Sequence, residues 1–129
     1  MDDLQRLFLT ELGQVGYSMT RTPGGLEQCG CDYRNKLIYL GADAPEPYVW
    51  IAALHELGHA NTLRNFFEPG LDEHEALVLC NLRRALDRHF KYAEELAAWS
   101  WAESRLVAGY EAEFQRLRTR ALTTYLPKL

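Results

Sequence analysis

His55-Glu56-Leu57-Gly58-His59 is the stretch of this chain that is most informative about both its fold and its chemistry. The pentapeptide has the pattern H-E-x-x-H, in which two histidines four residues apart lie on the same face of a helix. Two imidazoles in this arrangement can bind one tetrahedral Zn²⁺. Glu56 is not expected to be a ligand, because it points beside the metal, where it can take a proton from the attacking water. The pattern therefore predicts a zinc hydrolase, most simply a peptidase.

A third metal ligand has to come from elsewhere in the chain, because a catalytic zinc usually has three protein ligands and one position open to water. One zinc family supplies a glycine three residues and a histidine six residues after the pentapeptide. Here those positions hold Thr62 and Asn65, so that pattern is absent. The other common choice is a glutamate from a later helix. The candidates are Glu73, Glu75, Glu94, Glu95 and Glu103.

Hydrophobic spacing around the pentapeptide predicts a small set of helices and strands. The signature is expected on a helix over residues 47–64. Apolar residues at helical spacing predict further helices that begin near Asp2 or Asp3, Asp72, Tyr92 and Glu111. Three short β-like segments precede the signature helix, at residues 17–20, 26–33 and 37–40. The sequence therefore predicts a mainly helical α+β fold, with a small antiparallel sheet of about three strands packed beside the HExxH helix.

Several residues near the expected site predict close packing. Gly58 weakens a helix interior by about 1 kcal/mol relative to alanine, so a close backbone approach by the sheet is expected there. Trp99 and Trp101 are expected to pack around the zinc helix, because indoles usually fill a core and find a partner for their N–H. Cys29 and Cys31 are two residues apart and are expected to point to one strand face as reduced thiols.

The composition is that of an ordinary globular chain. Its 129 residues are 47% hydrophobic and 25% charged, which predicts one domain over residues 1–129. The net charge of −4 argues against nucleic-acid binding by this chain alone, because phosphate contacts need a basic surface.

The expected compartment follows from several negative features of the sequence. No apolar run is long enough to span a bilayer, and the acidic start Met1-Asp2-Asp3 lacks the basic region and apolar core of a signal peptide. The three cysteines have no regular spacing and do not suggest a disulfide framework. These features predict a cytoplasmic protein without membrane contact, and they leave the oligomeric state open.

A second informative stretch is Glu95-Leu96-Ala97-Ala98-Trp99-Ser100-Trp101-Ala102, with the pattern E-x-x-A-W-x-W-A. A pentapeptide H-E-x-x-H followed by E-x-x-A and an aromatic residue resembles the ImmA/IrrE-like zinc metallopeptidases, gluzincin-type proteins common in phages and mobile elements. The expected strand 37–40, the loop after it and the helix that opens into the signature fit the same resemblance. It covers roughly residues 26–102 and implies a zincin-like fold.

The resemblance also implies roles for individual residues. In that family the two histidines and the downstream glutamate bind zinc, and the glutamate of the pentapeptide is the catalytic base. Carried over to this chain, the ligands are His55, His59 and Glu95, and the base is Glu56. The stretch between His59 and Glu95 contains a whole additional helix, and Glu73 also stands in an E-x-x-A context, so Glu73 is the alternative third ligand.

The function that the resemblance implies is hydrolysis of a peptide bond in one or few regulatory proteins, such as a repressor or an antitoxin. The alternative is a zinc-binding module of a mobile element that interacts with a partner without turnover. Glu56 favours the enzyme, because a purely structural zinc site needs no base.

Two other parts of a peptidase site can be suggested from the sequence. Tyr92, Tyr110 and His74 are candidates for a donor that stabilises the oxyanion together with zinc. The strand at 37–40 could form a sheet edge beside the cleft, where an extended peptide adds as a further strand.

Overall fold

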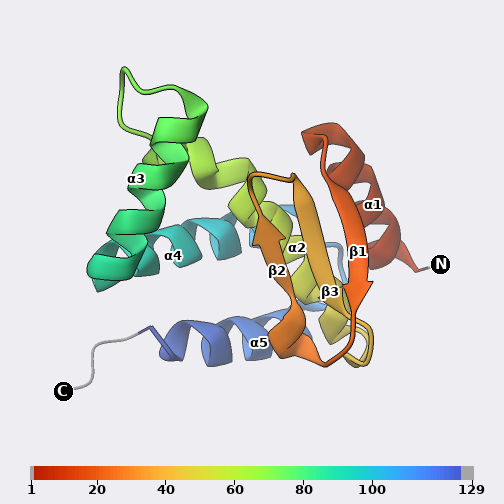
Figure 1. Cartoon of the computed structure of the whole chain (residues 1–129). Coiled ribbons are helices and arrows are strands. Elements are labelled where there is room, and N and C mark those ends of the chain that lie inside the picture. Colours follow the sequence, from red (N-terminus) through yellow and green to blue (C-terminus); the bar gives the residue numbers. More distant parts are fainter. Residues whose placement is uncertain (1, 126–129) are drawn as a thin grey trace.

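Five helices and a three-stranded sheet make up the computed structural model, which describes residues 2–125 (Figure 1). The elements are α1 (Asp3–Val15), β1 (Ser18–Thr22), the 3₁₀ turn η1 (Leu26–Gln28), β2 (Gly30–Asp32), β3 (Leu37–Gly41), α2 (Tyr48–Thr62), the 3₁₀ turn η2 (Leu63–Phe66), α3 (Glu73–Leu86), α4 (Arg88–Arg105) and α5 (Glu111–Thr123). The predicted mainly helical α+β class is confirmed. The predicted domain also includes residue 1 and residues 126–129, which lie outside the described part of the chain.

The sheet has the strand order β1-β3-β2, and it is mixed. β2 and β3 form an antiparallel hairpin, but β1 pairs with β3 in parallel, with Ser18 opposite Leu37 and Thr22 opposite Gly41. The expectation of a wholly antiparallel sheet is therefore corrected for this pair. The connection from β1 to β2 crosses one end of the sheet and leaves the central position free. β3 then fills this position and runs parallel to β1 (Figure 1).

The central position of β3 changes which strand borders the rest of the molecule. The strand at 37–40 was expected to form a sheet edge, but it corresponds to β3, which is the central strand. β2 is the edge on the side of α3 and α4 (Figure 1). The β-like segment at 26–33 is only partly extended, because its start forms the turn η1 and only Gly30–Asp32 pairs with β3.

α2 lies at the centre of the fold. Its residues from Val49 to Gly58 are all buried, because the sheet, α1, α4 and α5 all pack against it. This part of the helix is apolar apart from His55 and Glu56, which are 9% and 8% exposed. Two polar side chains in such a position need partners, since an unpaired buried polar group costs free energy.

The backbone of α4 comes close to α2 at Gly58. A Cβ at this position would overlap the carbonyl oxygen of Ala98. The predicted close backbone approach is confirmed, but the neighbour is α4 rather than the sheet. The contact is relevant to the site because α4 carries Glu95 three residues before Ala98.

α3 and α4 meet at Asp87. The side chain of Asp87 accepts hydrogen bonds from the backbone N–H groups of His89, at 2.9 Å, and Phe90, at 3.3 Å. This cap starts α4 at Arg88, earlier than the predicted start near Tyr92, since an aspartate at this position satisfies the free amides of the first turn.

None of the helices within residues 2–125 combines the length and the hydropathy that crossing a bilayer requires. Cys29 and Cys31 are free and half-buried, and Cys80 is free and buried.

Candidate metal centre

α2 presents the two histidines of the pentapeptide on one side. His55 and His59 lie one helical turn apart, and their ring centroids are 4.7 Å apart. His55 is buried and His59 is half-buried. Because the helix that carries them is enclosed by other elements, the two rings are held on a rigid part of the fold.

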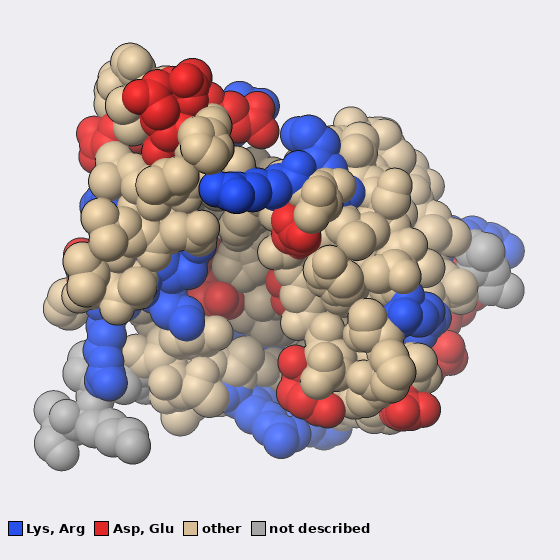
Figure 2. Space-filling view, in the orientation of Figure 1, with Lys and Arg blue, Asp and Glu red and all other residues tan. Residues whose placement is uncertain are grey.

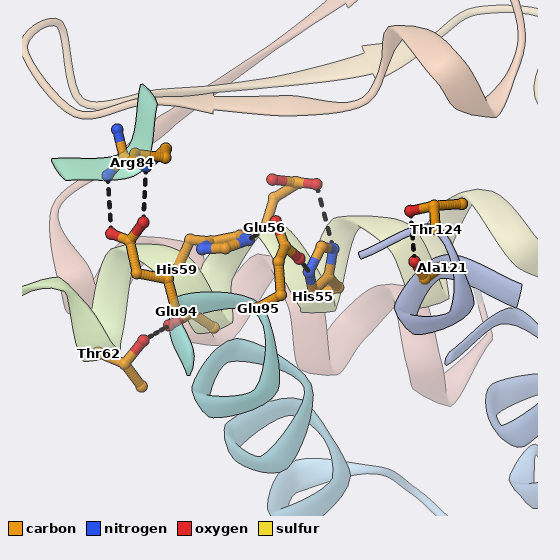
Figure 3. A network of polar contacts seen from close by, with 10 residues as sticks. His55, Glu56, His59, Thr62, Arg84, Glu94, Glu95, Ala121 and Thr124 are labelled. Atoms are coloured by element: carbon orange, nitrogen blue, oxygen red, sulfur yellow. Dashed lines mark hydrogen bonds and ion pairs between the residues drawn. The ribbon is translucent and has the colours of Figure 1, made fainter. Parts of the chain in front are cut away.

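Glu95 on α4 reaches both histidines (Figure 3). Its Oε2 atom lies 2.9 Å from His55 Nε2, and its Oε1 atom lies 3.2 Å from His59 Nε2. One ligand atom from each of the three residues lies within 4.8 Å of the others, so the group could hold a metal ion. Ligand atoms that surround a tetrahedral ion at about 2.0–2.1 Å are about 3.3 Å apart, so the spacing and the donor types fit a zinc ion.

Two of the other candidate ligands lie at the start of α3, away from the histidines. Glu73 forms an exposed ion pair with Lys36, with an N–O distance of 3.8 Å. Glu75 forms a capping box with Asp72, in which each side chain accepts a hydrogen bond from the backbone N–H of the other. The alternative third ligand Glu73 is therefore not brought to the pair of histidines.

The two remaining candidates lie on α4 but face other partners. Glu94 is buried and accepts two hydrogen bonds from Arg84 of α3, at 2.6 and 2.7 Å. Glu103 is exposed and accepts a hydrogen bond from Gln115 of α5 at 2.7 Å. Glu94 and Glu95 are adjacent and diverge by about 100° around the helix, so only one of them can face α2.

Glu56 stands beside the histidines, on the side of α2 that faces the sheet (Figure 3). Its Oε2 atom lies 3.2 Å from His55 Nδ1. Histidines that bind a metal through one nitrogen commonly donate the other N–H to a carboxylate, which fixes the orientation of the ring. One carboxylate oxygen of Glu56 can therefore orient His55 while the other is available to a reacting group.

The carboxylates determine the protonation of the group. Burial lowers the pKa of His55, but the charges of Glu56 and Glu95 outweigh burial and raise this pKa to about 9. Burial raises the pKa of Glu95, but hydrogen bonds from His55 and His59 outweigh it and hold this pKa well below its usual range. Glu95 is therefore ionised at neutral pH, which is the form that binds a metal.

Trp99 packs directly on the first histidine. Its ring is stacked on the ring of His55, with centroids 4.1 Å apart and an interplanar angle of 13°. Phe114 of α5 meets the other part of the same indole at 5.4 Å in an edge-to-face arrangement. The expectation that Trp99 packs around the signature helix is confirmed, and its contact also fixes the plane of the His55 ring. The expected partner for its N–H is not found, because Trp99 Nε1 is buried without a hydrogen bond among the described residues. Trp101 is half-buried, under the guanidinium of Arg105.

The structure does not place the three expected oxyanion donors in contact with the group. Tyr110 caps the start of α5 and lies near the acidic residues of the N-terminus. Tyr92 lines a hollow between α4 and α5. His74 is exposed and lines an apolar hollow on the outer side of α3.

Tyr125, just beyond α5, brings a hydroxyl to the group, and sequence reasoning missed this residue. Its hydroxyl interacts with Glu95, and burial, followed by the charge of Glu95, raises the pKa of Tyr125 to about 12. The amino group of Lys91 lies 5.3 Å from the Tyr125 ring centroid, so α4 also holds the ring. Figure 3 shows the preceding residue, Thr124, on the side of the site next to His55 and Glu56. No local sequence signal marks Tyr125, because its position depends on how α5 folds back onto α4.

Two thiols of the sheet lie near the group without joining it. Burial raises the pKa of both Cys29 and Cys31, and the charge of Glu56 raises each of them further. The predicted strand face shared by both thiols is not formed, because Cys31 lies in β2 but Cys29 precedes the strand, at the end of η1. Among the described residues, the group that could hold a metal ion consists of His55, His59 and Glu95.

A hollow opens between α3 and the turn that joins β2 to β3 (Figure 2). It encloses a cavity of about 290 Å³, whose walls include Cys31, Tyr33 and Arg84. Arg84 binds Glu94, the chain neighbour of Glu95 (Figure 3). Cys31 lies near enough to Glu56 for the charge of Glu56 to raise its pKa.

Comparisons of this chain with protein-family models, curated proteins and solved structures found no match. The protein has an α+β fold in which two crossed helices, α2 and α4, bring two imidazoles and a carboxylate together as a candidate metal centre. The Glu56 carboxylate lies beside this centre, and its charge acts on Cys31, which lines a hollow.

Proposed function

We propose that this chain is a zinc-dependent metallopeptidase that hydrolyses a peptide bond in one or few protein substrates. The observation that carries the proposal is the position of Glu95, whose two oxygens lie 2.9 and 3.2 Å from the Nε2 atoms of His55 and His59. Two imidazoles and one carboxylate are a ligand set found in zinc peptidases, which keep a further position for water or substrate. Glu56 adds the base that such a reaction needs.

The residues of the centre divide the chemistry among them. A zinc ion held by His55, His59 and Glu95 would supply Lewis acidity toward water and the scissile carbonyl. Glu56 takes the proton from the attacking water and passes it to the leaving amine. The Tyr125 hydroxyl donates a hydrogen bond to the oxyanion that develops on the carbonyl oxygen.

The unpaired edge of β2 provides a place for the substrate backbone. β2 is the edge strand on the side of the cavity, so an extended peptide can pair with it through main-chain hydrogen bonds. β2 has only three residues, which limits the length of this pairing. A short pairing edge and a small cavity favour an enzyme with few substrates, such as a cytoplasmic repressor or antitoxin, over general protein digestion.

The experiment that tests the proposal is the substitution Glu56→Gln in the zinc-loaded protein. The variant keeps the size and hydrogen-bonding shape of the side chain but removes the base. We expect one zinc per chain by elemental analysis and a loss of peptide cleavage to background. The matched control is Glu103→Gln, which changes an exposed glutamate of α4 and should leave both zinc content and cleavage unchanged.

Two outcomes would count against the enzyme. Cleavage that persists at the wild-type rate in Glu56→Gln would remove Glu56 from the role of base. Full zinc content, with no cleavage of peptide libraries or co-purified proteins by the wild type, would favour a zinc-binding module without turnover.

A further inference from the structure

The cavity between α3 and the β2–β3 turn has a chemistry that differs from the acidic character of the whole chain. It is lined by Asp32, Tyr33, Arg34, Leu77, Asn81 and Arg84. Figure 2 shows basic side chains along its upper rim and on its α3 side, although the chain has a net charge of −4. Of the two cations in its lining, Arg84 is neutralised by Glu94, so Arg34 is the cation that can attract a negatively charged group of a ligand.

The acceptors of the cavity are already engaged within the protein. One Asp32 oxygen accepts the backbone N–H of Asn35 at 3.1 Å, and the other accepts its side-chain amide at 2.8 Å. Asn81 Oδ1 accepts a hydrogen bond from Arg84 Nη1 at 2.7 Å. This bond assigns the orientation of the Asn81 amide, so that its NH₂ group is the part left to donate.

Arg34 is the cation at this rim that forms no ion pair within 4 Å among the described residues, although its charge contributes to lowering the pKa of Asp32. Other cations nearby are paired: Lys36 with Glu73 at 3.8 Å, and Arg84 with Glu94 at 2.6 Å. Arg34 is exposed in the turn after β2 and lines the cavity, so its guanidinium can reach a ligand without breaking an existing ion pair. An unpaired guanidinium and a free amide donor together select a group that accepts hydrogen bonds.

We propose that this cavity is a specificity subsite that binds an acidic side chain, aspartate or glutamate, of the peptide substrate. The inference rests on the proposed peptidase function and adds the class of sequence that it recognises. A peptide paired with the edge of β2 would direct alternate side chains toward the two faces of the sheet. One of these side chains would enter the cavity beside α3, where Arg34 and the Asn81 amide bind its carboxylate.

The test compares peptides that bind with peptides that are cut. A proteome-derived peptide library is passed over zinc-loaded Glu56→Gln protein, and the retained peptides are identified by mass spectrometry. The same library is digested with the wild type. We expect retained and cleaved peptides to share an acidic residue at one fixed position. Arg34→Glu in the same background should weaken retention of acidic peptides about fivefold, the size of one solvent-exposed ion pair, and favour lysine there instead.

Two further variants keep the result interpretable. Asn81→Asp replaces the free amide donor with an acceptor, can still bind Arg84, and should also lose the acidic preference. Arg6→Glu makes the same charge change as Arg34→Glu on the exposed surface of α1 and should leave the preference intact.

The failures of the two proposals are distinguishable. Retention of acidic peptides that depends on Arg34, without any cleavage by the wild type, would support the subsite and refute the peptidase. Cleavage by the wild type with no acidic preference, or with a preference that Arg34→Glu leaves unchanged, would support the peptidase and overturn the subsite.

Discussion

His55 has a neighbour at each of its ring nitrogens and on one face of its ring. Nε2 faces Glu95, Nδ1 faces Glu56, and the indole of Trp99 covers the ring face. These contacts restrict the orientation of the ring, so Nε2 has a fixed direction, and a metal that binds there displaces its proton. A metal-binding histidine gains affinity from such restriction, because less side-chain entropy is lost on binding.

Removal of the Glu95 carboxylate tests whether Glu95 is the third metal ligand. Glu95→Ala should lower zinc affinity more than about 100-fold, since even residues that only orient a ligand contribute about 10- to 100-fold. The affinity is measured by competition with a chromophoric chelator. Glu73→Ala is the matched control, because Glu73 pairs with Lys36 on the surface. A larger loss in Glu73→Ala than in Glu95→Ala would reverse this assignment.

The role of Tyr125 is separable from metal binding. Tyr125→Phe removes only the hydroxyl, and under the proposed mechanism it should lower kcat about 100-fold with little change in KM, as the loss of an oxyanion donor does. Zinc content should stay at one per chain. Tyr92→Phe, in the hollow between α4 and α5, is the control and should retain full activity. An unchanged kcat in Tyr125→Phe would show that Tyr125 is not the oxyanion donor.

The chemistry of single residues was predictable where it depends on local spacing. The two histidines and Glu56 follow from one helical turn, and the structure brings Glu95 to them as the resemblance implied. Tyr125 could not be found in this way, because nothing near it in the sequence relates the end of α5 to α4. The same holds for the stacking of Trp99, for which the sequence predicted burial but not the partner ring.

At the scale of elements, the crossing of α2 and α4 depends on the absence of a side chain at Gly58. Alanine at an exposed helix position is normally favoured over glycine, by about 1 kcal/mol. At Gly58 the sign should reverse, because the new Cβ would overlap the Ala98 carbonyl and force the helices apart. We expect Gly58→Ala to lower the free energy of unfolding by about 1–3 kcal/mol.

Urea unfolding followed by circular dichroism measures this change. Gly13→Ala is the matched control: Gly13 lies in α1, and a Cβ there would meet nothing within 4 Å. It should raise the free energy of unfolding by about 0.5–1 kcal/mol. If Gly58→Ala proved as stabilising as Gly13→Ala, the close approach of α4 would not be a constraint on the fold.

The helices were predictable as elements, and their contacts were not. The signature helix was expected over residues 47–64 and spans Tyr48–Thr62, because its apolar run is continuous. The start of α4 was placed too late, since the cap by Asp87 was overlooked. Strand pairing is set by contacts far apart in the sequence, so the parallel pairing of β1 with β3 left no local signal.

At the scale of the whole molecule, a bound metal would join the centre of the fold to α4. A ligand that binds only the native state at 100 times its Kd stabilises that state by about 2.7 kcal/mol. For a chain of this size, such a gain raises Tm by about 10 °C. We therefore expect the zinc-loaded protein to melt about 10 °C above the chelator-treated protein in scanning calorimetry.

The variant Glu95→Ala provides the control for this measurement, since it should show the same Tm with and without zinc. A zinc-dependent rise of equal size in Glu95→Ala would place the stabilising ion elsewhere in the chain. No shift in the wild type would argue against a resident zinc.

The overall composition gives no indication that two arginines lie together on one cavity. A net charge of −4 predicts an acidic exterior, but the cations near the cavity come from the β2–β3 turn and from α3, which are far apart in the sequence. Their proximity arises only when α3 folds against the edge of the sheet. The sequence alone therefore determined the total charge and could not predict that Arg34 and Arg84 lie on one cavity.

The stack of Trp99 on His55 makes the protein its own optical probe. The chain has three tryptophans, and the Trp99 indole is the one in van der Waals contact with a ring of the candidate centre. Cu²⁺ and Co²⁺ quench indole emission at short range, so titration with either ion reports loading of the site as a loss of fluorescence. Trp99→Phe would silence that signal, while emission from Trp50 and Trp101 would persist.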